Sequence, residues 1–399
     1  MPVQLGFSGV CGADDILYRR RRPLSLDRDH GSSNEPSAHP HFVPCPPFSP
    51  GITTICHAID DTRSTRYFSV LSGNGGLSSG RQVMSQTPSV EEDSPIERTA
   101  VRLLRSSVDR SYHPEVDVDW DAPDVPGLRY VPDRYISLYG TKVFERMTEE
   151  EKIRLGRLEA SALASWGILA ESALMHPMLK LASVSDPRSA TAQYALTEVA
   201  DECRHSVMFG RQINTLSDRS YNPPMIARAL VGITALAPLS ATIFSMMLMV
   251  EEILDRLQRQ TMNDETLQPR TRAIAKIHVI EEARHISYAR VALARAVERT
   301  GRGRMALERL IVAVGAAVIP LIMVQPAVYR DAGLPPLRSA WTALRNPHYH
   351  ANLRFFGERL VRVMNENDML EGRLVQHLWR WSRMLPEDFV PQSKRTADV

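Results

Sequence analysis

One short motif occurs twice in this chain and limits the folds that the chain can adopt. Residues 201–205 and 281–285 both follow the pattern acid-Glu-x-Arg-His, and the copies lie 80 positions apart. In each copy the glutamate and the histidine are three residues apart, a spacing that puts both side chains on one face of a helix. One Glu-x-x-His means little in a charged helical chain, but two copies with matching flanks indicate a duplicated helical segment.

Two further glutamates extend this repeat. Glu171 precedes Glu202 by 31 positions, and Glu251 precedes Glu282 by the same 31 positions. Both Glu171 and Glu251 share a face with apolar residues at helical spacing. A buried carboxylate must be paired or must coordinate a metal. The pattern therefore predicts two helix pairs that place four glutamates and two histidines around a dinuclear metal site.

Helix-start signals and apolar periodicity divide most of the chain into long helices. A capping box at residues 148–151 opens the first, and Asp186-Pro187 is expected to cap the second. The chain contains no alternating strand pattern of any length. The four long helices are predicted over residues 148–182, 186–216, 222–262 and 269–300. Further helices follow Gly303, so the predicted class is all-α, a helical bundle with additional C-terminal helices.

The N-terminal part has a different composition. Residues 1–95 contain four consecutive arginines at positions 19–22, a proline-rich stretch and a Gly/Ser cluster, with no sustained periodicity. Such a segment cannot bury much apolar surface, so we expect a disordered extension before a helical domain over residues 96–399. Met84 could serve as a start, and we hypothesise that residues 1–83 are dispensable.

Charge, cysteines and apolar runs narrow the functional classes. The net charge is +2, which gives no argument for a nucleic-acid partner. The four cysteines form no C-x-x-C pair, which favours a reducing, cytoplasmic location over a disulfide framework. The uncharged run of residues 229–250 is long enough to span a bilayer. We interpret it as a buried core helix, because it contains Pro238 and leads directly into Glu251.

Charge balance indicates which metals the site would take. The four glutamates of the repeat carry four negative charges when ionised, and crowding them without cations would raise their pKa values strongly. Two divalent ions would cancel that charge. Carboxylate and imidazole ligands without thiolate suit iron or manganese. Zinc usually takes fewer ligands in tetrahedral geometry.

Other polar residues around the motifs receive separate predictions. His278 shares a face with Glu282 and His285, and we predict an additional ligand, the alternative being a hydrogen-bonded core histidine. Asp201 and Glu281 are expected to bind the far ring nitrogens of the motif histidines across the bundle. Arg204 and Arg284 would neutralise these two acids; the alternative is a set of solvated surface salt bridges. Glu252 is expected to point outward.

About residues 105–300 resemble the AurF-like diiron oxygenases, the p-aminobenzoate N-oxygenase family. The likeness includes residues 117–120, 137–140, 201–206 and 278–285. The His-x-x-x-Glu-x-x-His pattern of residues 278–285 is its most specific part, because a third histidine ligand marks the family. The resemblance implies a ferritin-like bundle with two iron ions, or manganese in their place. The ligands that it implies are Glu171, Glu202, His205, Glu251, His278, Glu282 and His285.

The same resemblance implies an activity. The best-known members of the family oxidise aromatic amines with dioxygen and an external electron source. We therefore expect a non-haem diiron N-oxygenase in the cytoplasm, acting on a small-molecule substrate with dioxygen. The sequence has no flavin or nicotinamide fingerprint, so an external electron donor is expected. No nucleic-acid or membrane partner is expected, and a homodimer is allowed.

Three other activities fit the same ligand set. One is a diiron C–H hydroxylase or desaturase, which would give a nitrogen-free product. The second is a non-redox dinuclear metal hydrolase, which would turn over without oxygen. The third is a ferritin-like iron store, which would show no substrate-dependent oxygen uptake and for which the sequence gives the least support.

Overall fold

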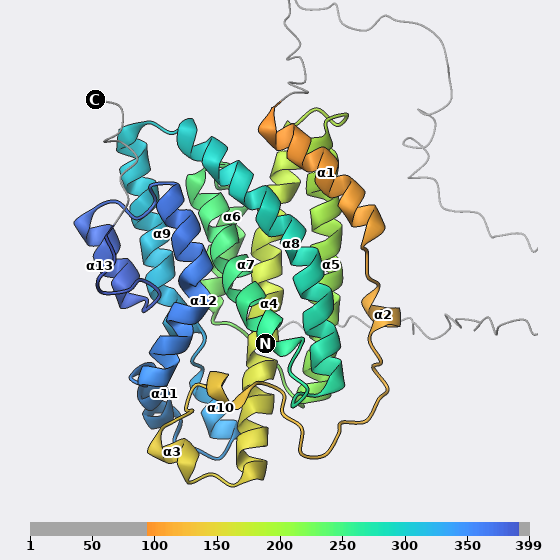
Figure 1. The fold of residues 1–399 in the computed structure, drawn as a ribbon, viewed down its shortest axis with the longest axis vertical. Helices are drawn as coiled ribbons and strands as arrows, with labels where there is room; N and C mark the ends of the chain where they lie inside the picture. Colours follow the sequence, from red (N-terminus) through yellow and green to blue (C-terminus); the bar gives the residue numbers. More distant parts are fainter. Residues whose placement is uncertain (1–93, 391–399) are drawn as a thin grey trace, which may run out of the picture. The chain divides into compact units, whose positions relative to one another are not determined.

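A computed structural model describes residues 94–390, and all of the extended regular elements in this range are helices (Figure 1). The predicted all-α class is therefore confirmed. The described residues all belong to one compact unit. The predicted disordered extension and the dispensability of residues 1–83 concern residues outside the described range, and they stay predictions.

Four long helices form the centre of the described unit. They are α4 (Glu149–Val184), α5 (Ala190–Leu216), α7 (Ala241–Thr261) and α8 (Pro269–Glu298). α4 packs along α5, and α7 packs along α8. The predicted capping box is present at the start of α4, where the Thr148 side chain accepts from the N–H of Glu151 and the Glu151 carboxylate accepts from the N–H of Thr148. α8 begins at Pro269, as predicted.

Two predicted helix boundaries are wrong. α5 begins at Ala190 and is capped by Ser189, whose hydroxyl accepts from the N–H of Ala192. The segment around Asp186 instead forms a turn, in which the Asp186 carbonyl accepts from the N–H of Ser189 at 2.8 Å. The predicted helix of residues 222–262 is two helices, α6 (Met225–Thr234) and α7. Pro238 lies in the gap, because proline lacks an N–H and disfavours helical backbone before it.

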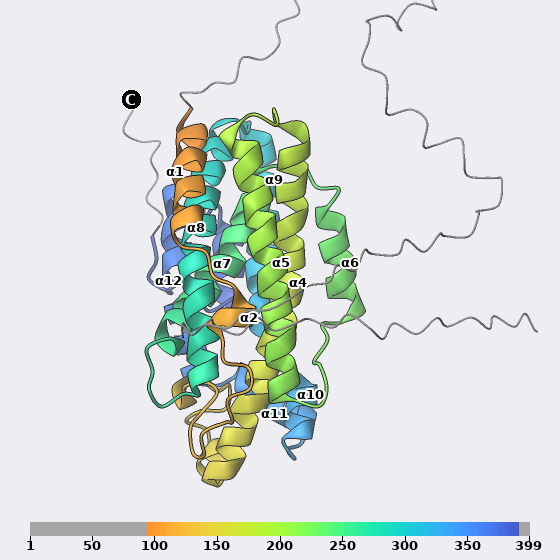
Figure 2. The same ribbon diagram turned by 90° about the vertical axis from the view of Figure 1, so that its right-hand side faces the viewer.

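The break after α6 gives the bundle its topology. α6 packs against α4 and carries the chain from the end of α5 back to the opposite end of the bundle, where α7 begins (Figure 2). α5 and α7 therefore run in the same direction, and α4 and α8 run in the other. One long crossover between two helix pairs is the connection found in ferritin-like bundles.

The outer helices cover the bundle on several sides. α1 (Pro95–Asp109) lies across α5 and α8, α12 (Pro347–Glu366) packs on α7, and α9 (Arg302–Ile322) packs on α7 and on α13 (Arg373–Trp381). The short elements are α2 (Pro114–Asp117), η1 (Asp133–Tyr135), α3 (Lys142–Glu145), α10 (Pro326–Asp331) and α11 (Pro336–Leu344).

The C-terminal helices explain why the prediction for Glu252 is wrong. Glu252 is buried, and Nε of Arg290 donates to its Oε1 at 2.9 Å. Asp255 lies on the same face of α7 and accepts from Arg359 of α12 at 2.9 Å. The sequence did not predict that α12 covers this face, so acids on it were expected to meet solvent.

One segment within the described residues, 302–331, passes a test of length and apolar composition for a membrane-crossing helix. Core helices of soluble proteins pass the same test. The N-terminal half of the segment makes polar contacts with other parts of the chain. Arg309 pairs with Glu371 at 2.6 Å, and Glu308 accepts from the N–H of Thr242 at 2.9 Å. The absence of a membrane partner stays a prediction.

A carboxylate at the side of the bundle makes stability depend on pH. Glu159 of α4 accepts from the N–H of Ser137 at 3.1 Å, and the Ser137 hydroxyl lies 2.7 Å from that of Tyr329. Burial raises the pKa of Glu159 to about 7, although the hydrogen bonds from Ser137 oppose this rise. The folded protein therefore holds a proton on Glu159 that the unfolded chain releases at lower pH.

We expect Glu159→Gln to flatten the pH dependence of stability between about pH 4.5 and 7. Because the folded pKa is the higher one, the contribution of Glu159 is fully present at acid pH and is lost as pH rises through this window. At about 1.4 kcal/mol per pKa unit, discounted for partial exposure, the change is on the order of 2 kcal/mol. Denaturant unfolding near pH 5 and pH 8 measures it, with the exposed Glu150→Gln as control. A variant that keeps the wild-type slope contradicts the prediction.

Candidate metal centre

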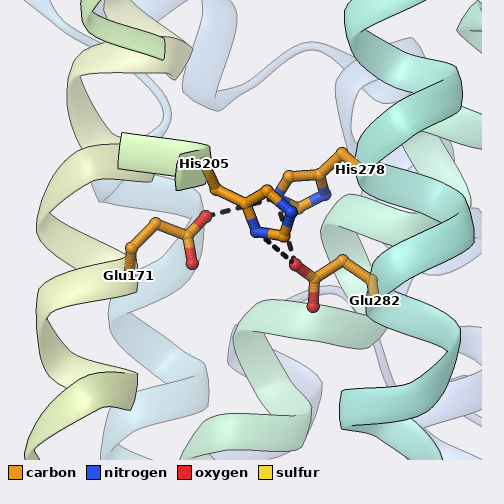
Figure 3. Close-up of side chains that lie close together, drawn as sticks. All are labelled: Glu171, His205, His278 and Glu282. Atoms are coloured by element: carbon orange, nitrogen blue, oxygen red, sulfur yellow. Dashed lines mark hydrogen bonds and ion pairs between the residues drawn. The ribbon is translucent and has the colours of Figure 1, made fainter. Parts of the chain in front are cut away.

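The seven predicted ligands lie together in one buried cluster between α4, α5, α7 and α8. Each is at most 2% exposed. They form two overlapping groups whose ligand atoms lie within 4.8 Å of one another: Glu171, His205, His278 and Glu282 in one, and Glu202, Glu251, Glu282 and His285 in the other. Figure 3 shows the first group, with side chains that point toward one another. Glu282 belongs to both groups and therefore lies between them.

The duplicated motif appears in the structure as matching distances. Nδ1 of His205 lies 3.0 Å from Glu202 and 3.1 Å from Glu282. Nδ1 of His285 lies 3.0 Å from Glu282 and 3.1 Å from Glu202. One imidazole nitrogen carries at most one proton, so it cannot satisfy two carboxylates by hydrogen bonding alone. This arrangement suits cations held between the nitrogens and the carboxylates.

His278 lies inside the cluster. Its Nε2 is 3.2 Å from Oε1 of Glu171 and 3.3 Å from Oε1 of Glu282 (Figure 3). The centroid of its ring lies 4.6 Å from that of the His205 ring. Its position therefore matches the additional ligand expected from the sequence better than a core histidine satisfied elsewhere.

The electrostatics of the cluster also favour the binding of cations. Burial, followed by repulsion from Glu171 and Glu282, raises the pKa of Glu202 well above its usual range. Burial and repulsion from Glu282 and Glu202 do the same for the pKa of Glu251, whose Oε1 has no hydrogen-bond partner. Carboxylates in such a place need protons or metal ions to balance them. The donor set, glutamates and imidazoles without thiolate, fits a pair of iron or manganese ions.

A second layer of acids surrounds the motif histidines. Oε2 of Glu281 lies 2.9 Å from Nε2 of His205, and Oδ2 of Asp201 lies 3.3 Å from Nε2 of His285. These contacts cross between α5 and α8, as the sequence predicted. Burial would raise the pKa of Asp201, but hydrogen bonds from His285 and Arg284 hold it down at about 2. Both acids are at most 2% exposed, which rules out the alternative of solvated surface salt bridges.

The arginines and the α1–α2 linker complete this layer. Arg284 donates to Oδ2 of Asp201 at 2.9 Å, and Arg204 pairs with the other oxygen of Asp201. Arg284 also donates to the carbonyl of Arg110 at 3.0 Å, and the N–H of Tyr112 donates to Oε1 of Glu281 at 3.1 Å. Nothing in the local sequence around residues 110–112 indicates these contacts, because they depend on how α1 crosses α5 and α8.

We expect Asp201→Asn and Glu281→Gln each to weaken metal binding about 10- to 100-fold without abolishing it. An amide keeps the shape of the acid but accepts a weaker hydrogen bond from the imidazole N–H, so the ring orientation is less well fixed. Metal retention during dialysis against graded chelator measures the effect. Glu252→Gln is the matched control, a buried acid that pairs with Arg290. Retention equal to wild type in both variants would contradict the role.

The sequence interpretation missed Glu198, although the repeat could have indicated it. His278 minus the 80-residue period is position 198, so Glu198 occupies in α5 the place that His278 occupies in α8. Glu198 is fully buried, and burial, opposed by the nearby His285, raises its pKa to about 7. Tyr194 and Tyr288, whose ring centroids lie 5.0 Å apart, adjoin it. The two repeats therefore differ at this position, where α8 has a histidine and α5 has a glutamate.

An apolar pocket of about 60 Å³ adjoins the cluster. The part of its lining nearest the cluster has one residue from each of the four bundle helices. Each of these residues is three or four positions along the chain from a predicted ligand. They are Gly167, Phe209, Leu254 and Ile274. The centroid of the Phe209 ring lies 5.1 Å from that of the His278 ring. A Cβ on Gly167 would lie 3.0 Å from the same Phe209 ring, so glycine lets the ring pack there. Phe209 therefore connects the pocket with the cluster, since it lines the one and packs against His278 of the other.

Comparison with known proteins gives one family match. The family model described as P-aminobenzoate N-oxygenase AurF matches residues 93–368. An uncharacterised protein of Mycobacterium tuberculosis (strain CDC 1551 / Oshkosh) is 25% identical over 298 residues, 72% of this chain and 84% of the relative. An uncharacterised protein of Mycobacterium bovis is 27% identical over 223 residues, 53% and 65% of the two chains. A solved R2-like ligand-binding oxidase with aerobically reconstituted Mn/Fe cofactor has a TM-score of 0.33 and 15% identity, covering 77% of this chain and 94% of that one.

Proposed function

Because the chain belongs to the p-aminobenzoate N-oxygenase family, we propose that it N-oxygenates a small aryl amine with dioxygen. The broader class is an oxygen-activating enzyme with a cofactor of two metal ions, iron or manganese, as the family and the buried cluster require. The observation that carries the narrower proposal is His278, the third histidine, within hydrogen-bond distance of both Glu171 and Glu282.

We propose that all seven residues of the cluster hold the ions. Glu282 would contribute to both ion positions, since it belongs to both ligand groups. When bound, the two ions supply the centre at which dioxygen is activated. Asp201 and Glu281 accept from Nε2 of His285 and His205, which fixes the tautomer that turns each Nδ1 lone pair toward the cluster.

The pocket determines what meets this centre. Phe209 and Ile274 present apolar surface beside the cluster, so water is excluded where the substrate nitrogen would lie. An aryl amine is uncharged near neutral pH and can enter such a site without losing a charged group's hydration. In N-hydroxylation one oxygen atom bonds to nitrogen and the other leaves as water, with two electrons and two protons from a donor. The proposal therefore includes an external electron donor.

The setting of the reaction is part of the same proposal. We place it in the cytoplasm, with a small-molecule substrate, dioxygen and the electron donor as partners and with a homodimer as the assembly to be tested. Gel filtration coupled to light scattering would measure the assembly directly.

The test compares two substrates of the same shape. Iron-loaded protein with a chemical reductant is given aniline or toluene under ¹⁸O₂, and the products are analysed by mass spectrometry. We expect ¹⁸O on the nitrogen of aniline and no turnover of toluene, with metal-free protein as the blank. Oxygen on carbon would instead favour a C–H hydroxylase, and turnover without dioxygen would favour a hydrolase. Oxygen uptake that no substrate changes would favour an iron store.

A further inference from the structure

The pocket beside the cluster has no charged residue in its lining. We propose that the site takes single-ring aryl amines with an uncharged hydrogen-bonding group opposite the amine, and that it rejects aryl amine carboxylates such as p-aminobenzoate. This inference rests on the proposed function, because it specifies the substrate of the same site. It does not follow from the family, whose namesake substrate, p-aminobenzoate, is itself a carboxylate. It follows from the residues that line the pocket of this chain.

The lining changes character along the bundle axis. The wall nearest the cluster is Gly167, Phe209, Leu254 and Ile274. One turn further out come Gln212, Gln258 and Thr271, each seven positions from a cluster residue on its own helix. Seven residues correspond to about 10 Å along a helix. An aryl amine with its nitrogen at the cluster would therefore direct the opposite end of its ring toward these neutral polar side chains.

The polar end offers amide chemistry. Among the described residues, the buried Oε1 of Gln258 has no hydrogen-bond partner, so it can accept from a substrate N–H. Two of the lining hydroxyls are engaged: Tyr130 donates to Asp124 at 2.6 Å, and Thr261 donates to the carbonyl of Leu257 at 3.1 Å. A glutamine side chain both donates and accepts, which complements a carboxamide on the substrate.

A carboxylate would have no cation to meet among the lining residues. Burying an unpaired carboxylate is costly, and neutral amides compensate only part of the lost hydration. Arg157 lies over the ring of Tyr130, 5.7 Å from its centroid, but its Nη2 donates to the carbonyl of Thr215 at 2.9 Å. Arg211 pairs with Glu115. Nε of Arg157 has no hydrogen-bond partner among the described residues, but neither arginine lines the pocket.

The size of the pocket limits the substrate to one ring. An engineered cavity of about 150 Å³ accommodates benzene. The pocket here has about 60 Å³, so even one ring requires a side chain to move. Phe209 already packs closely on Gly167 and cannot move toward it. The side chain that moves to admit the ring is therefore expected at the polar end of the pocket.

The experiment compares p-aminobenzamide with p-aminobenzoate, which differ mainly in charge. Binding to iron-loaded protein is measured by calorimetry near pH 7.5, and oxidation is measured separately as ¹⁸O in the product. We expect the amide to bind at least tenfold more tightly than the carboxylate. Gln258→Arg should reverse the preference by placing a cation at the polar end. Gln260→Arg, two residues further along the same helix, should leave the preference unchanged.

The outcomes separate this inference from the proposed function. Tighter binding of the amide without its oxidation supports the charge selection and counts against N-oxygenation. Carboxylate binding as tight as that of the amide in the wild-type protein overturns the charge selection, even if both compounds are oxidised at nitrogen. Failure of the amide to bind also overturns it. The wild-type comparison decides the matter should Gln258→Arg fail to fold.

Discussion

Glu282→Ala is expected to remove both metal ions and to lower turnover by at least about 1,000-fold, well beyond the 10- to 100-fold effect of second-layer changes. Glu282 is the one residue common to both ligand groups among the described residues, so its loss takes an oxygen ligand from both ion positions. Its carboxylate also lies close to Nδ1 of both His205 and His285, as the carboxylate of Glu202 does. Metal analysis of the purified variant, together with substrate-dependent oxygen uptake, measures the two effects.

Glu252→Ala is the matched control for this change. Glu252 is as deeply buried as Glu282 and carries the same side chain, but it pairs with Arg290. We expect the control variant to keep two ions per chain even if its unfolding temperature falls, because the change leaves a cavity at a buried position and removes the ion pair with Arg290. A Glu282→Ala protein that retained two ions would show that this carboxylate is not shared between them.

Chelation of the metal is expected to cost about 4 kcal/mol of stability if the ions bind at about 1,000 times their dissociation constant. In the chelated protein we expect Glu251→Gln to restore on the order of 1–2 kcal/mol, since it removes one buried charge that lacks a cation. Burial and repulsion from Glu282 and Glu202 raise the pKa of Glu251, so the folded state holds a proton there longer than the unfolded chain does. The contribution of Glu251 to the stability of the chelated wild type should therefore be largest at acid pH and fall as pH rises above about 4.5.

Thermal unfolding of both proteins near pH 5 and pH 8, with and without metal, measures this behaviour. The advantage of Glu251→Gln should be larger near pH 8 than near pH 5, and it should reverse when metal is present. If the variant were less stable than the wild type near pH 8 after chelation, Glu251 would not be a carboxylate that requires a cation.

The sequence predicted the cluster better than it predicted the surroundings of the cluster. Helical periodicity converts spacing into a shared face, so the 31- and 80-residue intervals were enough to select Glu171 and Glu251. The same reasoning extended a helix through residues 235–240, because apolar continuity outweighed Pro238. Burial of Glu252 and the close packing of Phe209 on Gly167 depend on contacts between helices far apart in the sequence. Local patterns carry no information about such contacts.

The two repeats carry different side chains at the equivalent positions 198 and 278, so the two sides of the candidate metal centre differ. On one side, His278 packs against Phe209, which lines the pocket. On the other side, Glu198 is buried together with Tyr194 and Tyr288. The pocket therefore lies on one side of the centre, and on the other side a buried carboxylate is enclosed by two tyrosines. The repeat is therefore asymmetric about the candidate metal centre, because α8 carries His278 where α5 carries Glu198 at the equivalent position.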